Sequence, residues 1–226
     1  MEKVELFFET LKNKLLKTCK LCNGTGKNNN ANCACMDKFE LYVQYHFRGL
    51  SQKYWDITLD DWKKDASTKK LIEEYIQNLN NAFNYGLSFL FSGSNGVGKT
   101  MLMSIILKEA YKADYKIKFL DTRHLLDKEK SKNAATVDFL ALDNFGDEQD
   151  FPNKEAYVGA IRQLIWNRVT NIKPTLIATN FNLDQINEVY GRTVFSYIVN
   201  TFKAVILSGA DFRKIQKNDW EGLLKQ

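Results

Sequence analysis

The spacing of hydrophobic residues changes part of the way along the chain. Residues 2–18 and 65–84 place apolar side chains at intervals of three and four, which predicts amphipathic helices, and residues 37–46 predict a short helix or strand. From Leu87 onward, short apolar runs alternate with helical stretches. The predicted strands are 87–91, 117–120, 137–142, 175–179 and 204–207, and the clearest helices are 100–112 and 156–169. This alternation predicts an α/β fold with a parallel sheet that helices cover on both faces.

Composition and charge indicate the class of protein and the compartment in which it works. Hydrophobic residues make up 44% of the 226 residues and charged ones 26%, which is typical of a globular chain with a sizeable core. The net charge of +5 is too small to indicate a nucleic-acid partner. No apolar run approaches the roughly 20 residues that span a bilayer, and the charged N-terminus lacks the apolar stretch of a secretory signal. We therefore expect a cytoplasmic protein with no membrane contact.

The 4 cysteines of the chain lie close together near its beginning. They are Cys19, Cys22, Cys33 and Cys35, in the pattern C-x2-C, ten residues, C-x-C. Clustered thiols in a reducing compartment bind metal more often than they form disulfides, so this pattern predicts a Zn²⁺ site. Four protein ligands leave no open position, and the site is expected to be structural.

The cysteine cluster also divides the chain. We expect residues 1–47 to form an N-terminal helix with the zinc module, and residues 48–226 to form the α/β domain. The apolar stripe of helix 2–18 either packs on this module or binds a partner protein.

Residues 93–100 match the phosphate-loop pattern G-x-x-x-x-G-K-[ST], with an apolar strand before them and a helix after them. Glycines let successive backbone N–H groups surround a polyphosphate, and the helix N-terminus adds a favourable dipole. Lys99 is expected to reach the β- and γ-phosphates of ATP, and the Thr100 hydroxyl to join the Mg²⁺ shell. The expected nucleotide-binding residues are Gly93, Ser94, Asn95, Gly96, Val97, Gly98, Lys99 and Thr100.

Polar residues at the end of the third predicted strand complete this site. Asp143 is the expected partner of Thr100 in holding Mg²⁺. Asn144 stands where an ATPase usually has a second carboxylate, and an amide can orient water but cannot accept its proton. Asp147 or Glu148 could take that role, or both are ordinary loop carboxylates.

With these residues placed, the chain resembles the DnaC/DnaI-type replicative helicase loaders and the related IstB-type transposition ATPases of the AAA+ class. The resemblance covers nearly the whole length, and the cysteine knuckle ahead of an ATPase core is its most specific part. Its motifs are Cys19-x2-Cys22-Asn-Gly-Thr-Gly with Cys33-x-Cys35, the phosphate loop, Leu142-Asp143-Asn144-Phe145-Gly146, Leu176-Ile177-Ala178-Thr179-Asn180-Phe181, and Asp211-Phe212-Arg213.

The resemblance implies roles for further residues. Asn180 would be the first sensor of the γ-phosphate, although an Asn at a strand end can also simply form a turn. Arg213 would be the second sensor, and Tyr54 and Trp55 would lie near the adenine. The expected catalytic set is therefore Lys99, Asp143, Asn144, Asn180 and Arg213. The resemblance also implies a hexameric replicative helicase as partner, gripped by the zinc module, with single-stranded DNA and ATP-dependent self-association as further expectations.

The chain departs from this family where subunits usually cooperate. Tyr197 occupies the position of an arginine that the family offers to a neighbouring subunit's nucleotide, and Arg192 and Arg168 are the basic residues that could compensate. The segment 125–136 is shorter than its counterpart in these loaders. Together with Asn144, these departures predict slow ATP turnover and weak helical self-assembly.

Three functions stay open at this point. The first is a helicase loader for replication initiation, in a version that suits a phage or mobile element. The second is an IstB-type transposition ATPase that binds duplex DNA. The third is a weakly hydrolysing inhibitor or decoy of a host helicase or its loader. The cysteine module favours the first over the second, because it looks like a protein-docking element. DNA binding has little support, since the lysines are scattered along the chain.

Overall fold

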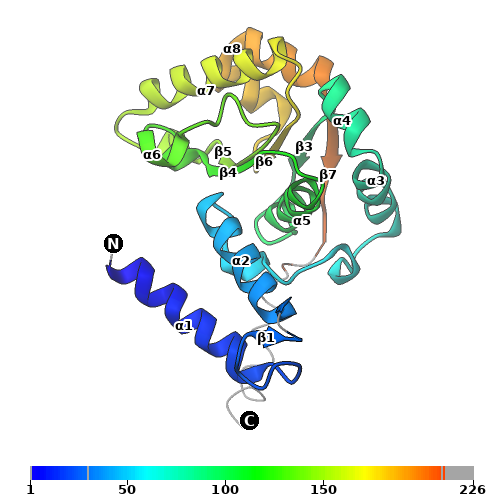
Figure 1. The fold of residues 1–226 in the computed structure, drawn as a ribbon. Coiled ribbons are helices and arrows are strands. Elements are labelled where there is room, and N and C mark those ends of the chain that lie inside the picture. Colours follow the sequence, from blue (N-terminus) through cyan, green and yellow to red (C-terminus); the bar gives the residue numbers. More distant parts are fainter. Residues whose placement is uncertain (1, 30, 210, 212–226) are drawn as a thin grey trace. The chain divides into compact units, whose positions relative to one another are not determined.

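The computed structural model describes residues 2–29, 31–209 and 211, and it divides the chain into two compact units, Met1–Trp55 and Asp56–Gln226 (Figure 1). The elements of the first unit are α1 (Glu2–Thr18), the antiparallel strands β1 (Lys27–Asn28) and β2 (Ala31–Asn32), α2 (Ala34–Phe47) and the 3-10 turn η1 (Gln52–Tyr54). The segment predicted as a helix or a strand is therefore helical. The pattern did not reveal the hairpin, because strands this short carry no periodic signal.

Aromatic rings hold the first unit together. Helix α1 meets α2 through Phe8, whose ring centroid lies 5.1 Å from that of His46. Trp55 is buried against Tyr42 at a centroid distance of 4.9 Å, and its Nε1 donates a hydrogen bond to the Leu50 carbonyl oxygen at 2.9 Å. Trp55 thus packs inside the first unit, which extends beyond the boundary that the sequence placed at residue 47.

The second unit begins with the 3-10 turn η2 (Leu59–Asp61) and two helices, α3 (Ala66–Gln77) and α4 (Leu79–Tyr85). The sequence predicted one helix over residues 65–84. It is interrupted at Asn78, which has non-helical backbone angles of φ −118° and ψ 35° and whose Nδ2 donates to the Glu74 carbonyl oxygen. Asn favours such breaks because its side chain competes for backbone hydrogen bonds.

The α/β part of the second unit follows. Its strands are β3 (Ser88–Ser92), β4 (Ile117–Asp121), β5 (Phe139–Phe145), β6 (Thr175–Thr179) and β7 (Phe202–Ile206). Its helices are α5 (Lys99–Lys112), α6 (Lys128–Ser131), α7 (Lys154–Thr170) and α8 (Leu183–Thr201), with 3-10 turns η3 (Thr122–His124) and η4 (Asp147–Asp150). Within the described residues, no helix combines the length and apolar content needed to cross a membrane.

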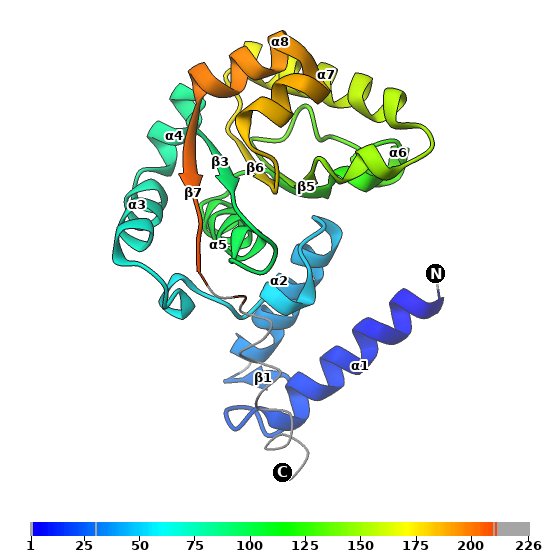
Figure 2. The same cartoon turned by 180° about the vertical axis from the view of Figure 1, so that it is seen from behind.

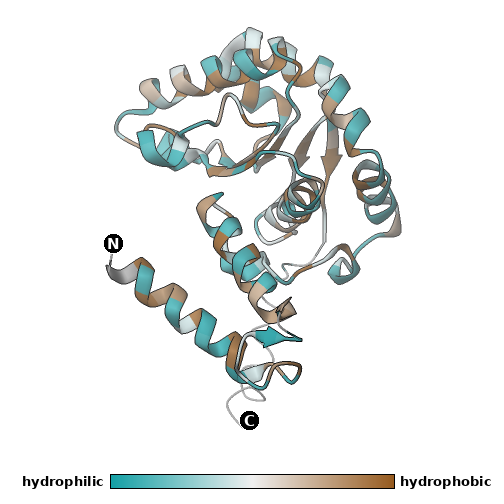
Figure 3. Cartoon of the chain, in the orientation of Figure 1, coloured by the Kyte–Doolittle hydropathy of each residue, from teal (hydrophilic) through white to brown (hydrophobic). Residues whose placement is uncertain are grey.

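The five strands form one parallel sheet in the order β4-β5-β6-β3-β7, which confirms the predicted α/β architecture. Helix α5 covers one face, and α7 and α8 cover the other, as the two opposite views show (Figures 1 and 2). The strands are strongly hydrophobic, whereas the outer helices mix polar and apolar positions (Figure 3). Strands buried on both faces are expected to read as continuous apolar runs, as β3, β5 and β6 do, whereas the edge strands β4 and β7 carry lysines and are partly exposed.

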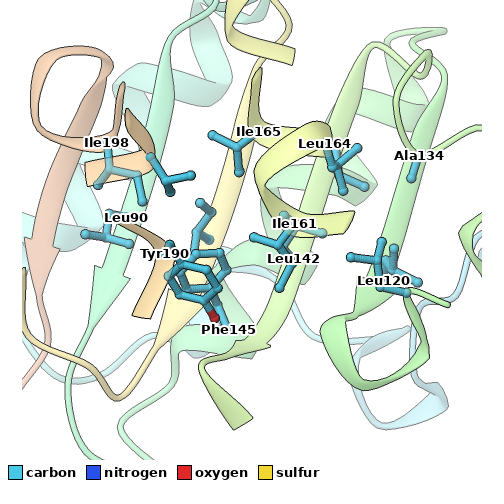
Figure 4. Close-up of a cluster of buried hydrophobic side chains, with 14 of the residues drawn as sticks. Leu90, Leu120, Ala134, Leu142, Phe145, Ile161, Leu164, Ile165, Tyr190 and Ile198 are labelled. Carbon is cyan, nitrogen blue, oxygen red and sulfur yellow. The ribbon is translucent and has the colours of Figure 1, made fainter. Parts of the chain in front are cut away.

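Side chains from the sheet and from α7 and α8 form a continuous core (Figure 4). Ile161 and Ile165 of α7 and Leu142 of β5 are fully buried, and the rings of Phe145 and Tyr190 lie 4.4 Å apart. Burying each such aliphatic side chain contributes about 1.5–3 kcal/mol. The residues at the carboxyl ends of the strands are therefore attached to a well-packed core.

Strand β5 differs from its prediction at both ends. It begins at Phe139 and continues through Asp143 to Phe145, beyond the predicted end at residue 142. Its register with β6 is irregular between Leu142 and Phe145, and Asn144 adopts a positive φ of 57°. This irregularity lies at the carboxyl edge of the sheet, beside the phosphate loop.

Candidate nucleotide and metal sites

The phosphate loop connects the end of β3 to the start of α5. Gly93, with a φ of 148°, could not carry a side chain, because a Cβ there would lie 2.2 Å from the Leu207 carbonyl oxygen. A Cβ on Gly96 would lie 1.8 Å from Oδ1 of Asp211. Glycine is therefore required for two reasons, the backbone conformation and the close approach of neighbouring groups.

Lys99 is buried at the beginning of α5, with 9% of its surface exposed. Its Nζ donates to the carbonyl oxygens of Gly93 at 2.5 Å and Ser94 at 2.9 Å, and to Oδ1 of Asn180 at 2.8 Å. Asn180 in turn donates from Nδ2 to Oδ1 of Asn95 at 3.1 Å. The structure therefore brings the loop lysine and the residue expected to be the first sensor into direct contact, although they are far apart in sequence.

Thr100 and Asp143 face each other between α5 and β5. The Thr100 hydroxyl donates to Oδ2 of Asp143 at 2.9 Å. Burial raises the pKa of Asp143, and the hydrogen bond from Thr100 opposes that effect. Mg²⁺ prefers oxygen ligands at 2.0–2.1 Å in an octahedron, which places neighbouring ligand oxygens about 2.9 Å apart. The two oxygens fit adjacent positions in such a shell.

Asn144 turns toward the neighbouring strand β4. Its Nδ2 donates to Oδ2 of Asp121 at 2.8 Å, and its carbonyl oxygen accepts a hydrogen bond from the Thr122 hydroxyl at 2.8 Å. Asp121 also accepts from Nε of Arg123 at 2.8 Å. Although burial opposes it, this set of hydrogen bonds lowers the pKa of Asp121. Sequence reasoning missed Asp121, although an acidic residue directly after a predicted strand of a parallel sheet is a usable signal.

Glu148 is fully buried. Its Oε2 accepts hydrogen bonds from the Gly146 backbone N–H at 3.1 Å and from the Thr122 hydroxyl at 3.0 Å, so it braces the loop after β5. Burial is also the main reason that its pKa is raised. These contacts give Glu148 a structural role, and its suggested role as a replacement for the catalytic carboxylate stays a prediction. Asp147 is half-buried, and burial raises its pKa too.

The structure also corrects the role considered for Arg168. This residue of α7 is fully buried and cannot reach a neighbouring subunit. Its guanidinium donates to Thr175 Oγ1 and to the carbonyl oxygens of Ala134, Val137, Asp138 and Pro174. Arg192 on α8 is exposed, and Tyr197 is half-buried. Arg213, the expected second sensor, lies outside the described residues.

The four cysteines come together in the first unit. Their Sγ atoms lie within 4.8 Å of one another, with Cys19–Cys33 and Cys22–Cys35 each 3.6 Å apart. Tetrahedral zinc with Zn–S bonds of about 2.3 Å has sulfur–sulfur distances of about 3.8 Å. The backbone N–H of Gly26 donates to Sγ of Cys22 at 3.3 Å. Burial acts to raise the pKa of Cys22, but this hydrogen bond and those from the other thiols outweigh it and lower the pKa to about 6. The cluster fits a zinc-binding module.

No protein-family model and no curated protein matches the chain. Among solved structures, a DnaC helicase loader is 26% identical, with 70% of this chain and 100% of that chain covered and a TM-score of 0.59. DnaI is 19% identical, with 72% and 94% covered and a TM-score of 0.58. The replication initiator DnaA, bound to AMPPCP and single-stranded DNA, is 20% identical, with 76% and 56% covered and a TM-score of 0.55. The chain has the fold of the DnaC/DnaI-type helicase loaders, and the expected α/β AAA+ fold is confirmed.

Proposed function

We propose that the chain is an ATP-dependent loader of a replicative DNA helicase that acts in replication initiation. The observation that carries this proposal is the contact between Lys99 and Asn180, beside the Thr100–Asp143 pair, on the fold of a DnaC helicase loader. A unit with four clustered cysteines precedes this site in the chain. The two features serve different purposes, nucleotide response and protein docking.

The loop residues would bind the phosphates of ATP with groups that are already in place. Lys99 now donates to the carbonyl oxygens of Gly93 and Ser94, and it would exchange these neutral acceptors for charged phosphate oxygens. Thr100 Oγ1 and Asp143 Oδ2 would supply two ligands to Mg²⁺, which neutralises charge on the phosphates when it is bound.

Asn180 would couple nucleotide binding to the rest of the second unit. It shares Lys99 with the phosphate loop, and the next residue, Phe181, accepts a hydrogen bond at its carbonyl oxygen from Ser92 Oγ at 3.1 Å. Helix α8 begins two residues later, at Leu183. A change in the partner of Lys99 would therefore act on the segment that leads into α8.

The first unit would dock on the helicase. Four protein ligands, three of them buried, suit a structural metal and leave the outer surface of the unit for recognition. Leu21 is 67% exposed and Phe47 is 63% exposed, so the unit presents large apolar side chains to solvent. Large exposed apolar side chains become a docking surface where they gather into one patch.

Mass photometry of the full chain mixed with the cognate hexameric helicase tests this function. We expect an ATP-dependent complex with the wild-type chain, and its ATP dependence should be lost in Lys99→Ala. Cys22→Ser should abolish the complex with or without ATP. A wild-type chain that forms no complex with the helicase under any nucleotide condition would exclude the loader function.

A second candidate function is an inhibitor of the same helicase or of its loader. It is favoured by the amide at Asn144, where an ATPase usually has a second carboxylate, and by the burial of Arg168, which removes one replacement for the arginine missing at Tyr197. A helicase inhibitor binds the helicase as a loader does, so a loading assay on circular single-stranded DNA separates them. A loader raises the amount of helicase that engages circular single-stranded DNA, whereas an inhibitor lowers it.

A further inference from the structure

The carboxylate missing at position 144 has a counterpart on the neighbouring strand. Asp121 is the last residue of β4, and its Cα pairs in register with that of Asp143 on β5. Register partners on adjacent strands project from the same face of a sheet. Asp143 points to Thr100 on α5, so Asp121 lies on the α5 face as well, one strand farther from the phosphate loop.

The side chain of Asn144 is bound to this carboxylate. Its Nδ2 donates to Oδ2 of Asp121 at 2.8 Å, and the positive φ of Asn144 together with the hydrogen bond from the Thr122 hydroxyl to its carbonyl oxygen fixes this orientation. An amide has no basic atom for a proton of water, whereas a carboxylate has. The second carboxylate that an ATPase usually carries next to Asp143 on β5 is therefore supplied here by Asp121 on β4.

We propose that Asp121, positioned by Asn144, is the carboxylate that orients the attacking water and accepts its proton during ATP hydrolysis. This inference rests on the proposed nucleotide site. The oxygen of water forms a bond to the γ-phosphorus, and the bond from that phosphorus to the β–γ bridging oxygen breaks, with its electron pair leaving on ADP. One proton of the water passes to Asp121 and then to solvent.

Arg123 controls access to Asp121. Its Nε donates to Oδ1 and its Nη2 to Oδ2 of Asp121, so the guanidinium covers both carboxylate oxygens, and the arginine side chain is 45% exposed. An incoming γ-phosphate carries more negative charge than the Asp121 carboxylate and offers the guanidinium the same two-oxygen geometry. Movement of Arg123 to phosphate would free the lone pairs of Asp121 for water.

The alternative is that Asp121 only stabilises the turn after β4. Its Oδ1 accepts a hydrogen bond from the Arg123 backbone N–H at 3.0 Å, as the cap of η3. The two roles are separable, because Asp121→Asn keeps one oxygen acceptor for the cap and removes the carboxylate, and the Asn144 amide can turn so that its oxygen accepts from the new amide N–H. Asp138→Asn is the matched control. Asp138 is 21% exposed against 20% for Asp121, pairs with Lys173 and accepts a hydrogen bond from the Lys116 backbone N–H.

The experiment uses the full chain, with labelled ATP in single-turnover hydrolysis over hours and a fluorescent ATP analogue for affinity. In Asp121→Asn we expect hydrolysis to fall by about 10²–10⁴-fold, the usual contribution of a general base. ATP affinity should stay within about threefold and the melting temperature should match that of Asp138→Asn, because the lost group acts on water. Asp138→Asn should hydrolyse ATP at the wild-type rate.

The exchanged double variant tests the positioning role of Asn144. Asp121→Asn combined with Asn144→Asp returns one carboxylate to the pair, and we expect it to recover at least tenfold over Asp121→Asn alone. Unchanged hydrolysis in Asp121→Asn, no recovery in the double variant, or a wild-type chain that binds ATP with Mg²⁺ and hydrolyses none of it would each overturn the proposal while leaving the nucleotide site intact. A wild-type chain that binds no ATP would instead remove the proposed function and this inference with it.

Discussion

The two units of the chain hold their chemical sites in opposite ways. In the first unit, Cys22, Cys33 and Cys35 are themselves part of the buried interior, where Leu16, Cys19 and Met36 pack against them. In the second unit, the phosphate loop lies at the edge of a sheet whose core is made of other residues (Figure 4). Loss of the first site should therefore remove a fold, whereas loss of the second should remove only an activity.

Two buried cationic side chains of the second unit also differ in whether their contacts serve binding or stability. Lys99 and Arg168 both donate to backbone carbonyl oxygens. The acceptors of Lys99 include the exposed residues Ser94 and Asn180, where water or phosphate can replace it. The acceptors of Arg168 are enclosed between α7 and the sheet, where neither water nor phosphate can replace the guanidinium. Contacts of similar chemistry thus serve binding in one place and stability in the other.

The largest effect is expected from metal removal. Purified chain should carry one zinc, and a strong chelator should unfold the first unit, because a structural zinc site contributes roughly 10–16 kcal/mol at neutral pH. Hydrogen exchange should show loss of protection in α1 and α2, with the strands β3 to β7 unaffected. Lys99→Ala is the control, and treatment with the chelator should remove the protection of α1 and α2 in this variant as well. Intact chain that contains no zinc would contradict the assignment.

Arg168→Ala should destabilise the second unit by about 3–5 kcal/mol, since it leaves several buried carbonyl oxygens without donors. Arg162→Ala is the matched control on the same helix. Arg162 is exposed and its Nε makes one hydrogen bond, to the Tyr190 carbonyl oxygen at 2.8 Å, so its loss should cost about 1 kcal/mol. Urea denaturation measures both. Equal costs for the two variants would mean that the buried network is not what holds α7 to the sheet.

Lys99→Ala should weaken ATP binding at least about 100-fold, equivalent to about 2.7 kcal/mol, because the phosphates lose their main cation. Its free energy of unfolding should change by only about 1 kcal/mol, since water can reach the acceptors that the lysine leaves. Titration with a fluorescent ATP analogue and urea denaturation give the two values. Lys112→Ala, an exposed lysine of the same helix that pairs with Glu109, should change neither. An unchanged ATP affinity in Lys99→Ala would refute the nucleotide site.

The sequence predicted the sheet and the phosphate loop well because both depend on local patterns. Five apolar runs became the five strands, and the loop glycines imposed their backbone conformation. The break at Asn78 and the extension of β5 to Phe145 were missed, since each depends on hydrogen bonds that a hydrophobic pattern does not encode.

Side-chain partners were the least predictable part of the site. The burial of Arg168 and Glu148 and the contact of Asn144 with Asp121 arise from elements that meet only after folding. Charged residues look alike in sequence whether they face solvent or a ring of carbonyl oxygens. The role considered for Arg168 therefore needed correction, whereas Lys99, Thr100 and Asp143 came together at the predicted edge of the sheet.

The smallest effect concerns pH, and the two units should respond to it in different pH ranges. Lys108 of α5 is buried and donates to the Ile57 carbonyl oxygen. Burial, with a smaller contribution from Lys112, lowers the pKa of Lys108 from 10.5 to about 8. Between these values the unfolded chain binds more protons than the folded one, so the free energy of unfolding of the second unit should rise as pH increases from about 8.

Lys108→Met isolates this contribution, because the other titrating groups are common to both proteins. Urea denaturation of wild type and variant between pH 8 and 9.5 should show a stability difference that narrows as wild-type Lys108 loses its proton. Zinc retention by the first unit should fall only on acidification, since protons compete with the metal for the thiolates. A wild-type-minus-variant difference that stays constant across this range would mean that Lys108 keeps its charge in the fold, and that the second unit tolerates a buried ammonium as fully as it tolerates the guanidinium of Arg168.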